Sequence, residues 1–219
     1  MKQQKFRAAV FDLDGTLLDT LYDLGACADR ALAACGFPGH SMEEYRTYIG
    51  NGIPKLIARA VPPGTSEEDI QRVLKVYLSE YPEHCAEHTR FFPGAAQTVR
   101  TLRERGYALA VLSNKTETTA RKIIDHYFPD RPFCAVWGNN GVRPLKPATD
   151  AGYLLLQELG CAPQEVFYLG DGDTDMTFAS RMGFFAAAAT WGYRPAEILK
   201  ECGAQALVSS MQEILPYLP

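Results

Sequence analysis

The stretch AAVFDLDGTLLDT, residues 8–20, places two aspartates, Asp12 and Asp14, directly after a short apolar run. Such a run is typical of a strand buried on both faces of a parallel sheet. Side chains two residues apart point to the same side of a strand, and open parallel sheets bind ligands at the carboxyl ends of their strands. The stretch therefore predicts two carboxylates at a ligand site, although a solvated turn rich in Asp and Gly would give the same pattern.

Further apolar runs downstream alternate with stretches of helical pattern. The runs cover residues 107–114, 132–139, 165–171 and 183–190, and the helical stretches cover 94–105, 116–127, 148–159 and 174–182. Strands that alternate with helices of this length indicate an α/β fold with a doubly wound, Rossmann-like parallel sheet.

Between residues 19 and 90 the alternation stops and only helical patterns occur. Gly36 and Pro38 end the first of these helical segments, and Ser66 with the acids that follow it is a typical start of the last one. The sequence therefore predicts a core domain formed by residues 1–18 and 91–219, with residues 19–90 inserted as an all-helical domain.

Composition excludes several classes of protein. The 219 residues are 47% hydrophobic with a net charge of -4, and they contain neither a long basic run nor an apolar run near the roughly 18 residues that span a bilayer. We expect a cytoplasmic protein that binds neither nucleic acid nor membrane. The six cysteines form no CxxC pair, which favours reduced thiols over a zinc site.

A second acidic cluster, YLGDGDTDM at residues 168–176, follows another apolar run. An EF-hand loop starting at Asp171 would need Gly and Glu where Met176 and Met182 stand, and a GxGxxG fingerprint would need Gly in place of Asp175. Both alternatives fail. Carboxylates from two strand ends repel one another unless a hard cation lies among them, and Mg²⁺ is the natural candidate for an all-oxygen site.

Three further polar residues suit a phosphate group. Ser113 and Asn114 end one apolar run, and Lys146 lies in the loop RPLKP, residues 143–147, before a helix. A hydroxyl, exposed backbone N–H groups and an ammonium group are what a phosphate needs. Each residue alone is a weak signal, but together they predict a phosphate site.

These segments resemble the haloacid dehalogenase superfamily, whose phosphatases work through an aspartyl-phosphate. The four matching motifs are Asp12-Leu-Asp14-Gly-Thr16, Ser113-Asn114-Lys115, Lys146-Pro147 and Gly170-Asp171-x-x-x-Asp175. The insertion at 19–90 resembles the helical cap of that superfamily. The segments SNK, residues 113–115, and TWGYR, residues 190–194, are similar to its phosphoglycolate phosphatase branch, from which Gly172 and the Pro-Ala pair after Lys146 depart.

The resemblance implies a role for each matched residue. Asp12 would be the nucleophile and Asp14 the general acid and base. Thr16, Ser113, Asn114 and Lys146 would bind the phosphate. Asp12, Asp171 and the main-chain carbonyl of Asp14 would bind Mg²⁺. Asp175 would orient a metal ligand or a bound water.

The expected substrate is a small phosphorylated metabolite, with phosphoglycolate ahead of pyrophosphate and nucleoside monophosphates. A hexose-phosphate mutase of the same fold stays open as an alternative, and a non-catalytic binding protein is least favoured because the matched acids and Lys146 are all present. We expect a monomer or homodimer. In the segment YIGNGIPK, residues 48–55, Asn51 and Lys55 are the candidates to reach the leaving group, although a turn joining two helices explains its glycines equally well.

Overall fold

The computed structural model describes residues 6–219, so the first five residues of the predicted segment 1–18 lie outside it. A parallel sheet has the strand order β5-β4-β1-β6-β7-β8. Its strands are β1 (Ala8–Phe11), β4 (Ala108–Thr116), β5 (Ala135–Asn139), β6 (Val166–Gly170), β7 (Phe185–Ala189) and β8 (Ala206–Val208). The predicted fold class is confirmed, and β8 is a strand that the sequence did not indicate.

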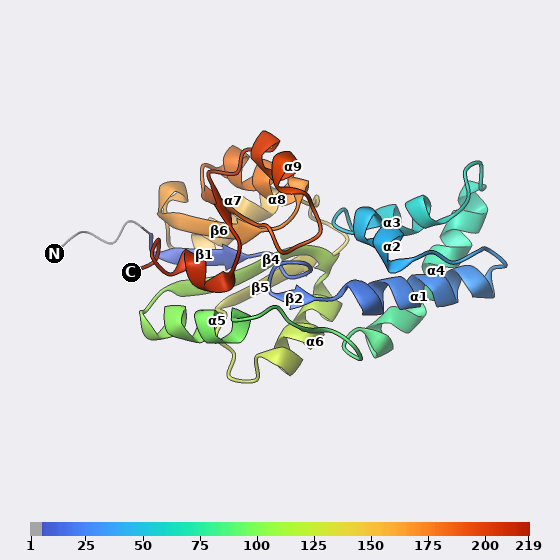
Figure 1. Ribbon diagram of the computed structural model, residues 1–219, viewed down its shortest axis with the longest axis horizontal. Coiled ribbons are helices and arrows are strands. Elements are labelled where there is room, and N and C mark those ends of the chain that lie inside the picture. Colours follow the sequence, from blue (N-terminus) through green and yellow to red (C-terminus); the bar gives the residue numbers. More distant parts are fainter. Residues whose placement is uncertain (1–5) are drawn as a thin grey trace.

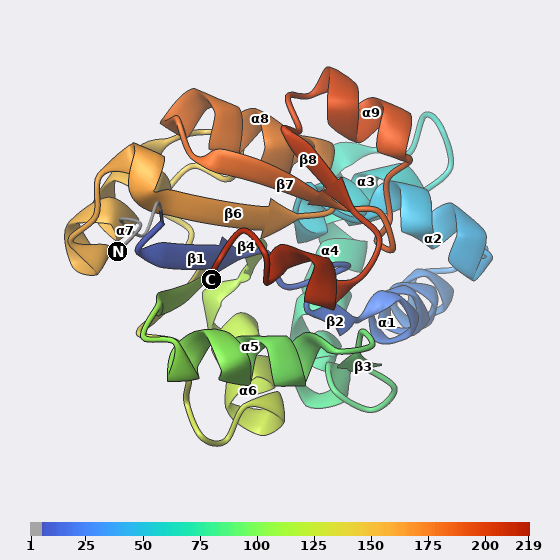
Figure 2. The same ribbon diagram turned by 60° about the vertical axis from the view of Figure 1, so that its left-hand side comes forward.

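Helices cover both faces of this sheet (Figures 1 and 2). One face carries α5 (Ala95–Glu104) and α6 (Glu117–Tyr127), and the other carries α7 (Asp150–Leu159), α8 (Asp173–Met182) and α9 (Ala196–Glu201). Alternate residues of β1 enter two separate apolar clusters: Ala9 and Phe11 lie in one, and Ala8 and Val10 lie in the other. Both sides of the strand are buried, which explains its continuous apolar run.

Four helices gather at one end of the molecule (Figure 1): α1 (Leu21–Ala34), α2 (Met42–Tyr48), α3 (Ile53–Ala60) and α4 (Glu67–His84). Residues 41–61, part of the stretch where the sequence shows only helical patterns, form two helices. Gly50 and Gly52 separate them with φ angles of 112° and 84°, a left-handed region that other residues rarely enter. Ser66 caps α4 by accepting a hydrogen bond from the backbone N–H of Asp69.

The chain enters and leaves this helical group through a short antiparallel ribbon. In it β2 (Leu18–Asp19) pairs with β3 (Arg90–Phe91). The buried carboxylate of Asp23 strengthens the junction, since it accepts hydrogen bonds from the backbone N–H groups of His88 and Thr89 at 2.9 and 2.8 Å. We propose that this ribbon is the boundary between a core of residues 1–18 and 91–219 and a cap of residues 19–90, called the helical insertion below.

Candidate active site

A tight turn places Asp12 and Asp14 at the carboxyl end of β1. Asp12 donates its backbone N–H to the carbonyl of Leu169 in β6, and Gly15 closes the turn with a φ of 83°. A side chain at position 15 would overlap the carboxylate of Asp171. Glycine is therefore required at this position for the two acidic segments to lie against each other.

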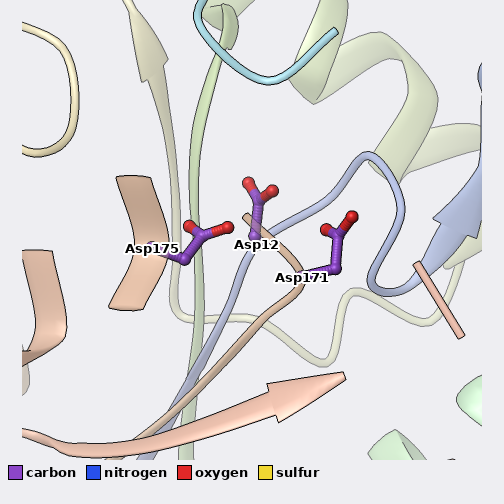
Figure 3. A group of neighbouring side chains, drawn as sticks. All are labelled: Asp12, Asp171 and Asp175. Carbon is purple, nitrogen blue, oxygen red and sulfur yellow. The ribbon is translucent and has the colours of Figure 1, made fainter. Parts of the chain in front are cut away.

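Three carboxylates converge there, as the sequence predicted for two strand ends. Asp12, Asp171 and Asp175 each offer an oxygen, and these atoms lie within 4.8 Å of one another (Figure 3). Burial raises the pKa of Asp12 to about 7, and the charge of Asp175 adds to the rise. Burial and Asp12 likewise raise the pKa of Asp171 well above its ordinary value. A cluster of buried, mutually repelling oxygen donors fits a hard cation such as Mg²⁺.

Lys146 provides a positive charge beside this cluster. Its Nζ lies 2.9 Å from Asp12 Oδ1 and 2.6 Å from Asp175 Oδ1, and it also donates to the Leu112 carbonyl and the Tyr168 hydroxyl. Burial by itself would lower the pKa of Lys146, but the charges of Asp12 and Asp175 outweigh it and raise that pKa. The lysine is therefore charged and firmly held next to Asp12.

Thr16 and Tyr193 hold the Asp171 carboxylate. The hydroxyl of Thr16 donates to Oδ1 at 2.9 Å, and the backbone N–H of Tyr193 donates to Oδ2 at 2.8 Å. The predicted phosphate ligand Thr16 is thus fully buried and bonded to a carboxylate. Tyr193 lies in the TWGYR segment, whose position beside the site no local pattern in the sequence indicated.

Asp14 faces a different set of partners from Asp12. Its two carboxylate oxygens lie 2.8 and 3.0 Å from Lys115 Nζ, and Oδ1 also accepts the hydroxyl of Thr20 at 2.7 Å. Lys115 belongs to the matched Ser-Asn-Lys motif but was not among the predicted site residues. The two candidate catalytic acids are therefore each paired with their own lysine, Asp12 with Lys146 and Asp14 with Lys115.

Ser113 and Asn114 are buried near the end of β4. The Ser113 hydroxyl accepts the backbone N–H of Lys115 at 3.3 Å. The amide of Asn114 donates to the carbonyls of Gly50 and Lys146 and accepts the backbone N–H of Lys146. Asn114, predicted to bind phosphate, thus uses its side chain to hold the Lys146 loop and to contact the helical insertion.

A pocket of about 40 Å³, enough for two or three waters, lies over Asp12 and Asp14. Ser113, Asn114 and Lys115 line it from the core, and Leu24, Ile49, Gly50, Gly52, Ile53 and Leu56 line it from the helical insertion. Asn51 and Lys55 do not line it: Asn51 is half-buried and Lys55 is exposed. The pocket side of α3 carries Ile53 and Leu56, three residues apart, and this spacing turns Lys55 away.

Two arginines connect the helical insertion to the core beside this pocket. Arg46 of α2 donates to the carbonyl of Gly192 at 3.2 Å, and Arg194 donates to the carbonyl of Arg46 at 3.0 Å. Arg194 also forms an ion pair with Asp173 at 3.2 Å. The helical insertion is thus held over the carboxyl end of the sheet by hydrogen bonds donated from the insertion to the core and from the core to the insertion.

Comparison with known proteins agrees with this architecture. The chain belongs to the haloacid dehalogenase-like hydrolase family, whose sequence model matches residues 9–189. Phosphoglycolate phosphatase 1 of Pseudomonas aeruginosa is 30% identical over 215 residues, which cover 96% of this chain and 79% of the relative. A phosphoglycolate phosphatase of Haemophilus influenzae is 32% identical over 196 residues, which cover 86% of this chain and 88% of the relative.

Solved structures show the same similarity. A crystal structure described as a predicted phosphoglycolate phosphatase from Haemophilus somnus matches with a TM-score of 0.90 and 26% identity, and the match covers 97% of each chain. The family and these relatives identify the chain as a phosphatase, a phosphoric monoester hydrolase. None of the helices in residues 6–219 combines the length and apolar character needed to cross a bilayer.

Proposed function

We propose that the chain is a Mg²⁺-dependent phosphatase that hydrolyses a small phosphorylated metabolite through an aspartyl-phosphate on Asp12, with phosphoglycolate as the first substrate to test. The observation that carries this proposal is the placement of Asp12 at the end of β1, 2.9 Å from Lys146 and within the carboxylate cluster. The names of the relatives support the choice of substrate.

In this proposal Asp12 attacks phosphorus, and Lys146 draws charge from the phosphoryl oxygens as it redistributes. Asp14 protonates the leaving alkoxide and later takes a proton from the water that hydrolyses the aspartyl-phosphate. Ser113, which lines the same pocket, offers its hydroxyl to a phosphoryl oxygen. Asp12, Asp14 and Ser113 already lie around the same pocket.

Asp12, Asp171 and the main-chain carbonyl of Asp14 would hold the Mg²⁺. Asp175 would orient a metal ligand or a bound water and not bind the ion directly. Its carboxylate already binds Lys146, the Tyr168 hydroxyl and the backbone N–H of Gly172. The ion would neutralise the repulsion between the nucleophile and the phosphate. Thr16 and Tyr193 would keep the Asp171 carboxylate in place, because each donates a hydrogen bond to one of its two oxygens.

The helical insertion would exclude water from the reacting groups and limit the size of the substrate. Its apolar residues Leu24, Ile49, Ile53 and Leu56 already close over Asp12 and Asp14. We therefore expect short phosphorylated metabolites to be better substrates than phosphoproteins or nucleic-acid ends.

A phosphate-release assay tests the proposal with phosphoglycolate, pyrophosphate, a nucleoside monophosphate and β-glucose 1-phosphate, each with Mg²⁺ and with EDTA. We expect release from phosphoglycolate that requires Mg²⁺ and exceeds release from the other compounds. Isomerisation of the sugar phosphate without release of phosphate would indicate the mutase alternative. The absence of phosphate release from every compound in Mg²⁺ would contradict the proposal.

A further inference from the structure

The residues that line the pocket carry a single positive charge, that of Lys115, within the described part of the chain. The other lining residues are the two aspartates, Ser113, Asn114 and a set of apolar and glycine residues. Lys146 is not among them, and its Nζ has four oxygen acceptors within 3.0 Å for its three N–H groups. Among these lining residues, Lys115 is therefore the cation available to pair with an anionic group of the substrate other than the phosphate.

The position of Lys115 suits the leaving group. Lys146 lies beside Asp12, where phosphorus would be attacked, whereas Lys115 contacts Asp14, where the leaving oxygen would take its proton. The side chain of Lys115 is 1% exposed, and its Nζ lies 4.8 Å from the centre of the Tyr81 ring in α4. The charge thus lies between the core and the helical insertion.

The wall that the helical insertion contributes has no side chain that could stabilise a negative charge. The helical insertion contributes leucines, isoleucines and the two glycines, so its side chains offer no hydrogen-bond donor there. Burying a carboxylate without a donor or a cation is strongly unfavourable. Among the described residues, only the Asp14 carboxylate accepts hydrogen bonds from Lys115 Nζ, which leaves that group able to share its charge with a second anion.

We infer that Lys115 binds a carboxylate on the leaving group and so directs the site toward short phosphorylated carboxylic acids. This inference rests on the proposed phosphatase function and assigns the choice of substrate to a core residue. It replaces the expectation that Lys55 of the helical insertion supplies the cation. The alternative is that Lys115 only balances the charge of Asp14, in which case the carboxylate of the substrate would make no difference.

Two non-hydrolysable ligands that differ in one group distinguish these alternatives. 3-Phosphonopropionate carries a carboxylate where propylphosphonate carries a methyl group. Binding of each in the presence of Mg²⁺ is measured by calorimetry, which requires no turnover. We expect the wild-type chain to bind the acid roughly 10- to 100-fold more tightly, the range of a hydrogen bond to a charged group. Lys115→Met should reduce this ratio to near one, and Lys115→Arg should keep most of it.

Lys55→Met is the matched control, because it removes an exposed lysine near the same pocket and should leave the ratio unchanged. A wild-type ratio near one, or a ratio that Lys115→Met does not change, would overturn the inference. If Lys115→Met does not fold, Lys115→Gln, which can still donate a hydrogen bond to Asp14, carries the same test. Failure of the proposed function is recognised separately, as a lack of phosphate release by the wild-type chain.

Discussion

Replacing Lys146 with methionine tests whether one buried charge holds the carboxylate cluster together. Methionine preserves most of the length of the buried stem but removes the ammonium group that lies 2.9 Å from Asp12 and 2.6 Å from Asp175. The Leu112 carbonyl and the Tyr168 hydroxyl lose the same donor. Asp12 and Asp175 would then lose their lysine while the buried carboxylate of Asp171 remains beside them.

The expected loss is large because the Lys146 side chain is only 3% exposed. Removing one partner from a buried ion pair lowers the free energy of unfolding by about 3–5 kcal/mol. For a chain of this size each kcal/mol lowers Tm by about 2–4 °C, so Tm should fall by roughly 6–20 °C. We expect this loss in EDTA at pH 8, and we expect Mg²⁺ to raise the stability of the variant because the ion binds only the folded cluster.

The loss should shrink as the pH falls. The pKa of Asp12 is already raised to about 7 with Lys146 present, and removing the lysine raises it further. Folded wild type and folded variant both bind the Asp12 proton more tightly than the unfolded chain, but the variant binds it at higher pH, so the stability of the variant relative to wild type rises as pH falls toward 7.

Urea unfolding followed by circular dichroism at pH 8 and pH 6 measures both effects. The control is Lys55→Met, an exposed position where we expect a change within about 0.5 kcal/mol. A loss below about 1 kcal/mol for Lys146→Met at pH 8, or a loss equal at the two pH values, would contradict a role for Lys146 in balancing the buried carboxylates.

Four further outcomes are expected. Asp12→Asn should reduce phosphate release by roughly 10³-fold or more while ligand binding in Mg²⁺ persists; substantial residual turnover would contradict a covalent mechanism. Asp14→Asn should slow hydrolysis of an alkyl phosphate by roughly 10²–10⁴-fold but that of p-nitrophenyl phosphate much less, because nitrophenolate leaves without a proton; equal losses would argue against the acid role. Because burial raises the pKa of Asp12 to about 7, Mg²⁺ must displace a proton below that pH. Its affinity should therefore fall from pH 8 to pH 6, and calorimetry in two buffers should detect the released proton, whereas a pH-independent affinity would contradict this view. Gly15→Ala should be destabilised by about 2 kcal/mol or more and should bind Mg²⁺ weakly, because its Cβ would overlap Asp171. Gly36→Ala, at a similar φ but in open space, should lose only about 1 kcal/mol of stability. Similar losses in the two variants would argue against the overlap.

The architecture and the meeting of the acidic segments follow from local patterns in the sequence. Apolar runs alternate with helical patterns, and that alternation is a local property that survives into the parallel sheet. Asp12 and Asp171 meet because parallel strands bring their carboxyl ends to one edge, whatever the paths of the loops. The turn at Gly50 and Gly52 is also a local feature, but the sequence left it open as one of two interpretations of residues 48–55, and the structure separates α2 from α3 there.

The contacts between groups inside the site, in contrast, depend on the three-dimensional packing of distant segments. Lys115 reaches Asp14 across 101 positions of the chain, and Tyr193 reaches Asp171 from a loop 22 residues further on. Asn114 binds a carbonyl in the helical insertion, and α3 turns Lys55 to solvent while Ile53 faces the pocket. Such pairings depend on strand register, helix rotation and loop path together, and no local pattern of residues encodes these three quantities.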